Sequence, residues 1–516
     1  MPATYTVRIT FDRAKNLPVA DIGTLSSDPY VLAFISSPEH LDLEPLTFRT
    51  PTIRRTRDPV WNSSWILGGV PETGFKLSMV LYDEDPGAKI SPDRLGKATA
   101  RFGAEQIKEG WELVEHEYVL QKRKGDLHPY LLTYFVALLP GEKLLKHNRV
   151  VVSVRVLAKD GEMSEDSRIY TLGPNRYSRH FSPLIGSMVN KHQTTPESEQ
   201  MDGKRRRLSA TTFVANKFQL TGPVPRELRH RYVGYRPFID WMFTDTGIAG
   251  HLLHYGLRKQ YRTIYACDKS TVWGVVEAGV NKSNTEKPNG QTEIESQEEH
   301  PSKPTSDTSE ALARQFLEMA SWGEGNKLFT YVITLDGEWR FTETGPEFAI
   351  DLLSKHSMHA NLAKEIAYSG EFFVQPLTEN IPGQVDGCLS STQRSEATKS
   401  SADRNPRDYE LVIDNDSGTY RPKKELLPVF QEWLADERRL GGLGRVRTMD
   451  GFDENLKKMK EERQKARTES RKHKPEKMVP VRMSSDGANS ISSGELERES
   501  VSGERIDQAL KEGDKS

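Results

Sequence analysis

Five aspartates near the start of the chain carry the clearest chemical signal in the sequence. They fall in two short runs, over residues 21–30 and 83–96, and they are Asp21, Asp28, Asp83, Asp85 and Asp93. Carboxylates gathered in a small volume repel one another unless a cation neutralises them. Because hard cations prefer oxygen ligands, a site of this composition suits Ca²⁺ better than zinc. The alternative is that the aspartates cap turns beside Pro and Gly.

The segments that precede the two runs must position them. Residues 5–11 and 75–82 alternate apolar and polar side chains, which is the pattern of half-buried strands. Gly, Pro, Asn and Asp residues interrupt these stretches at short intervals. This pattern predicts an all-β antiparallel sandwich with loops gathered at one end, and the alternating residues 150–157 suit a strand that closes it.

This part of the chain resembles a C2 domain of the calcium-binding type. Five short motifs carry the resemblance, in the order and spacing of that family: Asn16-Leu17-Pro18, Ser27-Asp28-Pro29-Tyr30, Arg57-Asp58-Pro59-Val60-Trp61-Asn62, Leu81-Tyr82-Asp83-Glu84-Asp85 and Asp93-Arg94-Leu95-Gly96. The resemblance implies that the five aspartates hold Ca²⁺. The second loop departs from the family pattern, since it is longer than usual between Asp85 and Asp93 and carries two prolines.

The resemblance also implies calcium-triggered binding to anionic phospholipids, above all phosphatidylserine. Bound Ca²⁺ reverses the local negative field and leaves coordination positions for lipid oxygens. Ile22, Leu25 and Ile90 lie within the two loops. We expect these side chains either to insert at the headgroup boundary or to pack against neighbouring loops.

A basic run precedes the Asp58-Pro59 motif. It consists of Arg54, Arg55 and Arg57, with Arg49 shortly before it. In many C2 domains a cationic strand at this place contacts phosphoinositides; the alternative is an ordinary solvated strand face.

Composition excludes several other classes. The net charge is −2 with 28% charged residues, so no global field points to nucleic acid. Cys267 and Cys388 are the only cysteines, which argues against a disulfide framework and fits a reducing compartment. The sequence shows neither a secretory signal nor a run of about 20 apolar residues. We therefore expect a cytoplasmic protein that meets membranes peripherally when calcium rises.

After the sandwich, the sequence predicts an α+β domain and a charged, partly disordered tail. The predicted segments are a C2 domain at 1–158, an α+β domain at 159–376 with a disordered insertion at 281–307, a linker at 377–407, a strand and helix packed on the second domain at 408–445, a charged helix at 446–475 and a disordered tail at 476–516. The second domain resembles a region of fungal proteins that contain C2 domains, and this resemblance implies no activity.

Local patterns in the second domain predict individual elements. Residues 248–261 and 348–368 are expected to be helices, and residues 326–344 a hairpin that turns at Asp336-Gly337. A third helix is expected at residues 425–439, with an apolar face toward the second domain.

Two pairs of histidines raise the question of catalysis. His251 and His254 are spaced by one helical turn, as are His356 and His359. With Asp351 and Glu371 they either form a metal site or are ordinary surface and core histidines. Because the sequence contains no nucleophile elbow, P-loop, dinucleotide fingerprint or kinase signature, no catalytic residue is nominated.

Two further segments suggest regulation. Lys204-Arg-Arg-Arg-Leu-Ser209 is a candidate phosphorylation site at Ser209 or a lipid contact, although such basic clusters also occur in solvated loops. Residues 454–474 are polar all round, which indicates an exposed helical arm or a contact with a protein partner.

Two functions fit these observations. The first is an adaptor for signalling or trafficking that binds anionic membranes in response to calcium. The second is a lipid-directed enzyme with its active site in residues 160–376. The missing motifs favour the adaptor.

Overall fold

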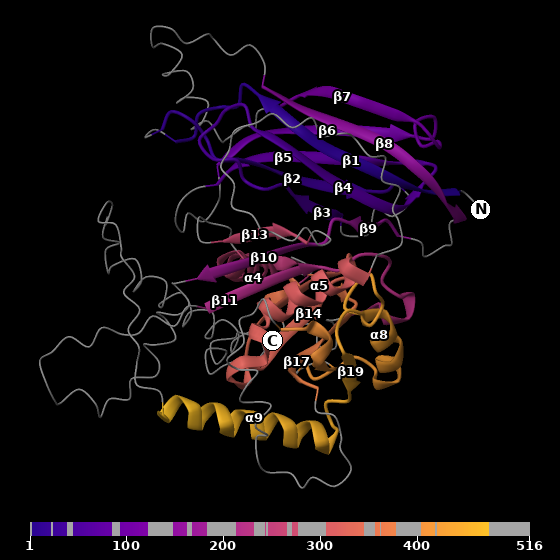
Figure 1. Cartoon of the computed structure of the whole chain (residues 1–516). Coiled ribbons are helices and arrows are strands. Elements are labelled where there is room, and N and C mark those ends of the chain that lie inside the picture. The colour runs from indigo at the N-terminus through magenta and orange to yellow at the C-terminus, as the bar shows by residue number, and fades with distance from the viewer. Residues whose placement is uncertain are drawn as a thin grey trace, which may run out of the picture. The chain divides into compact units, whose positions relative to one another are not determined.

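The computed structural model contains two β-rich layered assemblies (Figure 1). It describes residues 3–21, 24–38, 45–84, 93–121, 148–162, 168–182, 213–231, 243, 246–265, 271–276, 306–344, 357–361, 363–377, 404–417 and 421–473. Residues Met1–Arg467 form one compact unit.

The N-terminal assembly is an antiparallel sandwich of two sheets. One sheet has the order β7-β8-β1-β4-β9 and the other β3-β2-β5-β6. The bounds in the first are β1 Ala3–Lys15, β4 Val60–Pro71, β7 Glu112–Val119, β8 Arg149–Glu162 and β9 Tyr170–Gly173. Those in the second are β2 Pro29–Ser36, β3 Leu46–Arg49, β5 Gly74–Asp83 and β6 Arg94–Gly103. The predicted all-β sandwich is confirmed.

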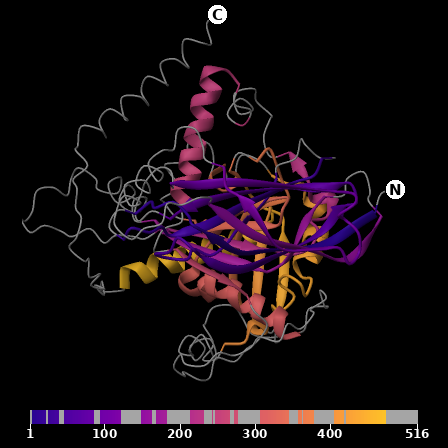
Figure 2. The same cartoon turned by 90° about the horizontal axis from the view of Figure 1, so that it is seen from above.

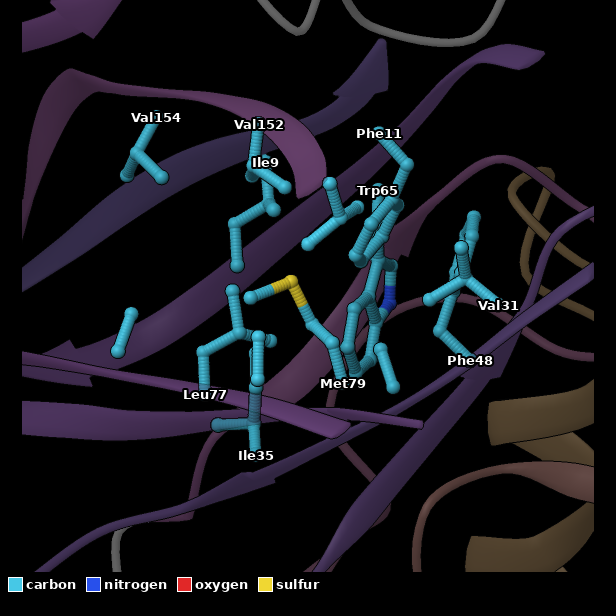
Figure 3. Close-up of a cluster of buried hydrophobic side chains, with 14 of the residues drawn as sticks. Ile9, Phe11, Val31, Ile35, Phe48, Trp65, Leu77, Met79, Val152 and Val154 are labelled. Atoms are coloured by element: carbon cyan, nitrogen blue, oxygen red, sulfur yellow. The ribbon is translucent and has the colours of Figure 1, made fainter. Parts of the chain in front are cut away.

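The sandwich forms because alternate side chains of both sheets are apolar and face each other. Figure 3 shows this core, with Ile9 and Val152 from one sheet beside Leu77 and Met79 from the other. The Trp65 ring lies 5.0 Å from that of Phe48, between centroids. Burying each such large side chain stabilises the fold by roughly 1.5–3 kcal/mol.

The closing strand, β8, is longer than the sequence predicted, and a further strand, β9, follows it in the same sheet. β8 pairs with β1 along almost its whole length, from Ala3 opposite Glu162 to Lys15 opposite Arg149. β9 then adds to the other side of β4, beyond the boundary expected at residue 158. The Trp65 indole nitrogen donates to Thr171 Oγ1 of β9 over 3.2 Å, which satisfies a buried polar group.

The second assembly is built on an eight-stranded sheet of order β13-β10-β11-β15-β14-β17-β18-β19. Its strands are β10 Arg176–Ser182, β11 Phe213–Gln219, β13 Val272–Val275, β14 Phe329–Ile333, β15 Glu338–Glu343, β17 Tyr368–Pro376, β18 Tyr409–Asp414 and β19 Arg445–Met449. Only the β18–β19 pair is parallel among these described strands. The helix α8 (Leu427–Leu434) makes the crossover that a parallel pair requires.

Helices cover both faces of this sheet. On one face, α5 (Ser306–Met319) and α8 pack on a large apolar core that includes Phe316, Phe430 and Trp339. On the other face lie α4 (Gly247–Tyr265), α6 (Ser357–Ala360) and α9 (Glu454–His473). The smaller elements are the strand pair β12 His230–Arg231 and β16 Glu365–Ile366, and the short 3-10 helices η2 Arg226–Leu228, η3 Ser321–Asn326, η6 Pro406–Asp408 and η7 Lys424–Leu426.

The hairpin and the first helix of this domain were predicted correctly. β14 and β15 are joined by a turn in which the Gly337 nitrogen donates to the Thr334 carbonyl over 3.0 Å. Gly337 has φ +76°, which glycine adopts without steric cost. The helix expected at residues 248–261 is α4.

The helix expected at residues 348–368 is present over Ser357–Ala360 and was wrong over residues 363–368. Glu365–Ile366 form β16, and Tyr368 begins β17, whose residues pair with β14 inside the sheet. Strand pairing within a buried sheet outweighs local helix propensity. Residues 345–356 lie outside the described part, and α6 is one short turn.

One helix and the predicted insertion differ in extent from the prediction. The helix expected at residues 425–439 is α8, which ends at Leu434. The insertion expected at 281–307 lies outside the described residues except for Ser306 and Asp307, which begin α5.

The charged helix α9 is present but is not a free arm. Leu456 is buried against Phe373 and Val412, with Met459 packed beside them. The Arg463 guanidinium lies 4.3 Å from the Phe373 ring centroid and donates to the Val374 carbonyl. One side of α9 therefore docks on β17 and β18.

Candidate metal centre

The two aspartate-bearing loops meet at one end of the sandwich because β2 and β5 are neighbours. Asp28 immediately precedes β2, Asp83 ends β5, and Pro29 pairs with Asp83 in the ladder. Asp93 immediately precedes β6, and its carbonyl accepts a hydrogen bond from the Asp83 nitrogen over 2.8 Å. Asp28, Asp83 and Asp93 thus lie on three adjacent chain segments.

Asp83 lies at the centre of this arrangement. Its side chain is fully buried, and its Oδ1 accepts from the Asp28 nitrogen over 2.5 Å. The next residue, Glu84, is also buried, and its nitrogen donates to the Asp28 carbonyl over 3.0 Å. Two buried carboxylates at consecutive positions require nearby positive charge.

The first loop is closed by its own backbone. The Asp21 nitrogen donates to the Ser26 carbonyl over 3.0 Å, and Asp21 forms an isolated bridge with Ser26. Ser27 Oγ donates to the Pro18 carbonyl over 2.6 Å. Leu25, at the loop tip, is 46% exposed and has φ +50°, which is uncommon outside glycine.

Of the remaining loop residues predicted to bind Ca²⁺ or contact the membrane, the structure describes one. Leu25 is described and faces solvent, which agrees with a headgroup contact without testing it. Asp85, Ile22 and Ile90 lie outside the described residues, as does Ser209.

The basic run supplies counter-charge to the acidic loops. Arg54 Nη1 lies 3.1 Å from Asp28 Oδ2, and the Arg55 nitrogen donates to Asp28 Oδ1 over 2.8 Å. Arg54 and Arg49 also approach Glu84 Oε2, at 3.9 and 3.6 Å. Arg54 and Arg55 follow β3, in its connection to β4, so the expected cationic strand is a connecting segment here.

The same connection is tied to the body of the domain. Arg57 Nε donates to the Leu17 carbonyl over 3.0 Å. Arg49 lies over the rings of Tyr30, at 3.8 Å, and of Trp273 on β13, at 4.2 Å. Arg49 therefore joins the acidic end of the sandwich to the edge strand of the second sheet.

The three described aspartates are residues of the type that Ca²⁺ prefers. Asp28, Asp83 and Asp93 lie on neighbouring segments of the two loops, and carboxylates are suitable ligands for a hard cation. In the part of the chain that the structure describes, no three His, Cys, Asp or Glu side chains are arranged as a metal site. Here Asp28 is instead held by Arg54 and Arg55.

The histidines of the second domain are arranged differently from a metal site. His359 is fully buried on α6, with Nδ1 2.5 Å from the Tyr265 hydroxyl and Nε2 3.1 Å from Thr330 Oγ1. His251 is exposed and His254 half-buried on α4. Glu371 forms an ion pair with Lys460 at 2.7 Å. His356 and Asp351 lie outside the described residues.

A largely buried cluster of charged residues under α4 was not predicted from the sequence. Lys217 Nζ donates to the Tyr261 hydroxyl over 2.9 Å and lies 3.5 Å from Glu338. Arg340 pairs with Glu338 and donates to the His359 carbonyl over 2.9 Å. Burial alone would raise the pKa of Glu338, but Lys217 and Arg340 lower it to about 2. Strand alternation places residues 338 and 340 on one face, although it does not reveal what covers them.

A second buried ion cluster anchors α9. Lys460 Nζ lies 2.7 Å from both Glu371 Oε2 and Asp414 Oδ2. Burial raises the pKa of Asp414 to about 6, an effect that Lys460 opposes and Glu371 adds to.

A comparison with protein-family models decides the nature of the sandwich. The model of the C2 domain matches residues 5–114. The N-terminal sandwich is a C2 domain. Its motifs at Asp28, Asp83 and Asp93 lie within the matched residues.

Several solved structures, among them structures of C2 domains, are similar to a part of the chain. A C2 domain of plant Extended Synaptotagmin 1 has 15% identity and a TM-score of 0.22, and the match covers 32% of this chain and 99% of that one. Human GIVD cytosolic phospholipase A2 has 16% identity and a TM-score of 0.21, and the match covers 35% of this chain and 19% of that one. A calcium-bound structure of two C2 domains of Extended-Synaptotagmin 2 has 17% identity and a TM-score of 0.21, covering 35% and 58%.

The likeness is local, since each of these matches covers about a third of the chain. The chain spans about a fifth of the length of the phospholipase that it matches, 19%. No curated protein matches the chain. Among the helices that the structure describes, none is long and apolar enough to cross a membrane.

Proposed function

We propose that the chain binds anionic phospholipid membranes in response to calcium, through its C2 domain, and acts as an adaptor in signalling or trafficking. C2 domains as a family generally bind phospholipid membranes. The observation that carries the calcium dependence is the convergence of Asp28, Asp83 and Asp93 at one end of the sandwich.

The residues that would hold Ca²⁺ are these three aspartates with Asp21 and Asp85. The ion would supply positive charge and coordination positions for the oxygens of phosphatidylserine. In the structure Asp28 forms an ion pair with Arg54, with 3.1 Å between Asp28 Oδ2 and Arg54 Nη1. Once Asp28 binds the ion instead, the Arg54 guanidinium becomes available to a lipid phosphate, including that of a phosphoinositide. Leu25 at the loop tip contacts the headgroup region.

The proposal can be tested with vesicles of phosphatidylcholine and about 30% phosphatidylserine. The full chain is sedimented with vesicles in Ca²⁺ or in chelator. We expect a larger bound fraction in Ca²⁺, and equal binding in the two conditions would overturn the calcium switch.

A paired substitution locates the ion. Asp83→Asn with Asp85→Asn removes two anionic ligands, so the calcium concentration for half-maximal binding should rise at least about tenfold, since each lost charge pair weakens a hard-cation site. The control is Glu105→Gln, an exposed carboxylate in the turn after β6, at the opposite end of that strand from Asp93. Equal effects of the two variants would contradict the assignment.

The lipid-directed enzyme stays a prediction, and the histidines considered for it do not form a catalytic site among the residues that the structure describes. His359, the buried histidine among those considered, is hydrogen-bonded at both ring nitrogens by Tyr265, Thr330 and Thr342. That arrangement stabilises the core and does not present an imidazole to a substrate.

A further inference from the structure

The outer side of α4 carries an apolar stripe that is not part of the proposed calcium site. Ile248, Leu252 and Tyr255 are 82%, 56% and 60% exposed. Their spacing, i, i+4 and i+7, places them on one side of the helix. Large apolar side chains exposed together on an ordered helix mark an interaction surface.

The inner side of α4 accounts for its attachment to the sheet. Leu253, Leu257 and Ile264 are buried, and Ile264 packs against Ala215 of β11. Tyr261 and Tyr265 reach Lys217 and His359 through hydrogen bonds of 2.9 and 2.5 Å. The outer stripe is therefore a separate feature, because the helix is already anchored without it.

The charge of α4 indicates which partner fits this stripe. Its sequence contains three basic residues, Arg258, Lys259 and Arg262, and no Asp or Glu. The apolar stripe occupies the first half of the helix and the basic residues follow it. A helix with apolar side chains on one side and only positive charge suits the surface of an anionic bilayer.

The position of α4 allows such a contact. Figure 2 shows α4 as the long pink-magenta helix. Its exposed side chains belong to the first two turns and a half, away from the Tyr261 and Tyr265 anchors.

We infer that α4 is a second membrane-contact element, which lies at the surface of an anionic phospholipid bilayer and needs no calcium. Ile248, Leu252 and Tyr255 enter the headgroup boundary, and Arg258 and Lys259 bind lipid phosphates. The inference goes beyond the proposed C2 function, since α4 belongs to the other domain and carries no acidic ligand.

The test uses the full chain and vesicles of phosphatidylcholine with about 30% phosphatidylserine, in chelator and in Ca²⁺. The variant is Ile248→Ser, Leu252→Ser and Tyr255→Ser together. We expect the partition coefficient to fall at least about tenfold in both conditions, because three inserted apolar side chains are removed. The matched control is Val114→Ser with Val119→Ser, which removes exposed apolar side chains from β7 and should leave binding unchanged.

A spectroscopic measurement reports insertion directly. An environment-sensitive fluorophore is attached to Leu252→Cys in a chain that also carries Cys267→Ser and Cys388→Ser. A blue shift on adding vesicles in chelator supports the inference, and an unchanged spectrum overturns it.

The outcomes separate this inference from the calcium proposal. If the serine variant binds vesicles like the wild type, the inference fails whatever Ca²⁺ does. If binding is equal in Ca²⁺ and chelator but falls in the serine variant, the calcium proposal fails and the inference stands. If the stripe instead joins two copies of the chain, light scattering will show a dimer that the variant abolishes while vesicle binding is unaltered, which also overturns the inference.

Discussion

Asp28 is both a proposed Ca²⁺ ligand and the partner of the basic run. Its carboxylate binds Arg54 Nη1 and the Arg55 nitrogen, while its own nitrogen donates to Asp83. A cation that takes Asp28 must therefore compete with Arg54, whose side chain is 42% exposed and can move into solvent. The acidic loops and the basic run, which were two separate signals in the sequence, act on one carboxylate.

Arg54→Gln tests this competition. With the competing charge removed, we expect the calcium affinity of the full chain, measured by titration calorimetry, to increase about threefold to tenfold. Arg101→Gln is the control, because Arg101 is exposed on β6 toward the end of the strand away from Asp93. Unchanged affinity for Arg54→Gln would contradict the competition.

Glu338 provides a prediction about stability. Its pKa is lowered to about 2 from the usual 4.5, so the ionised form stabilises the fold. That stability is fully present above about pH 4.5 and is lost as the pH falls through about 2. Glu338→Gln should lower the free energy of unfolding at pH 7 by roughly 3 kcal/mol, since it leaves Lys217 and Arg340 without their counter-charge.

Urea unfolding of wild type and variant at pH 7 and near pH 3 measures this difference. The difference should shrink at the lower pH, because the carboxyl of the unfolded chain, with its ordinary pKa of 4.5, takes up a proton there while that of the folded chain stays ionised. Glu115→Gln, in the exposed pair with Arg13, should leave the free energy nearly unchanged. An equal difference at both pH values would show that Glu338 acts through packing alone.

At the scale of elements, α9 shows how a highly charged helix can dock. Leu456 and Met459 supply the apolar contact, and Lys460, Arg463 and Arg467 reach acceptors on the sheet. These positions share one side of the helix at spacings of three and four residues. The outward side chains, such as Lys457 and Glu461, stay exposed.

Leu456→Ala should release this helix. Leu456 is 1% exposed, and a Leu→Ala change in a core costs about 2–5 kcal/mol, so the contact between α9 and the sheet should weaken by about that amount even though the Lys460 ion cluster remains. Hydrogen exchange of amides in Glu454–His473 should accelerate strongly, while β17 and β18 stay protected. Lys457→Ala is the control, and equal exchange in both variants would show that the ion pairs alone hold α9.

At the scale of the whole molecule, residues 3–467 carry two cores that polar and aromatic contacts join. Arg176 of β10 lies over the Phe48 ring at 3.8 Å and donates to the Arg49 carbonyl over 2.8 Å. Arg49 in turn lies over Trp273 and approaches Glu84. The C2 domain and the second domain are thus connected beside the acidic loops.

How much the sequence could predict depends on how local the pattern is. The strands of the C2 domain follow from alternation, and the turn at Asp336-Gly337 follows from glycine at a positive φ. The helix expected at residues 348–368 failed because Glu365–Ile366 and β17 are set by pairing with distant strands. A local pattern carries no record of such partners.

The same division holds for the functional residues. The sequence by itself determined the C2 domain and the charged helix, and it predicted a calcium site at the aspartates of the two loops, since each depends on residues close together in the chain. Only the tertiary structure decided that Arg54 holds Asp28, that Lys217 and Arg340 hold Glu338, and that α4 turns an apolar stripe outward. These features depend on which distant surfaces are buried together, and burial is a property of the packed molecule.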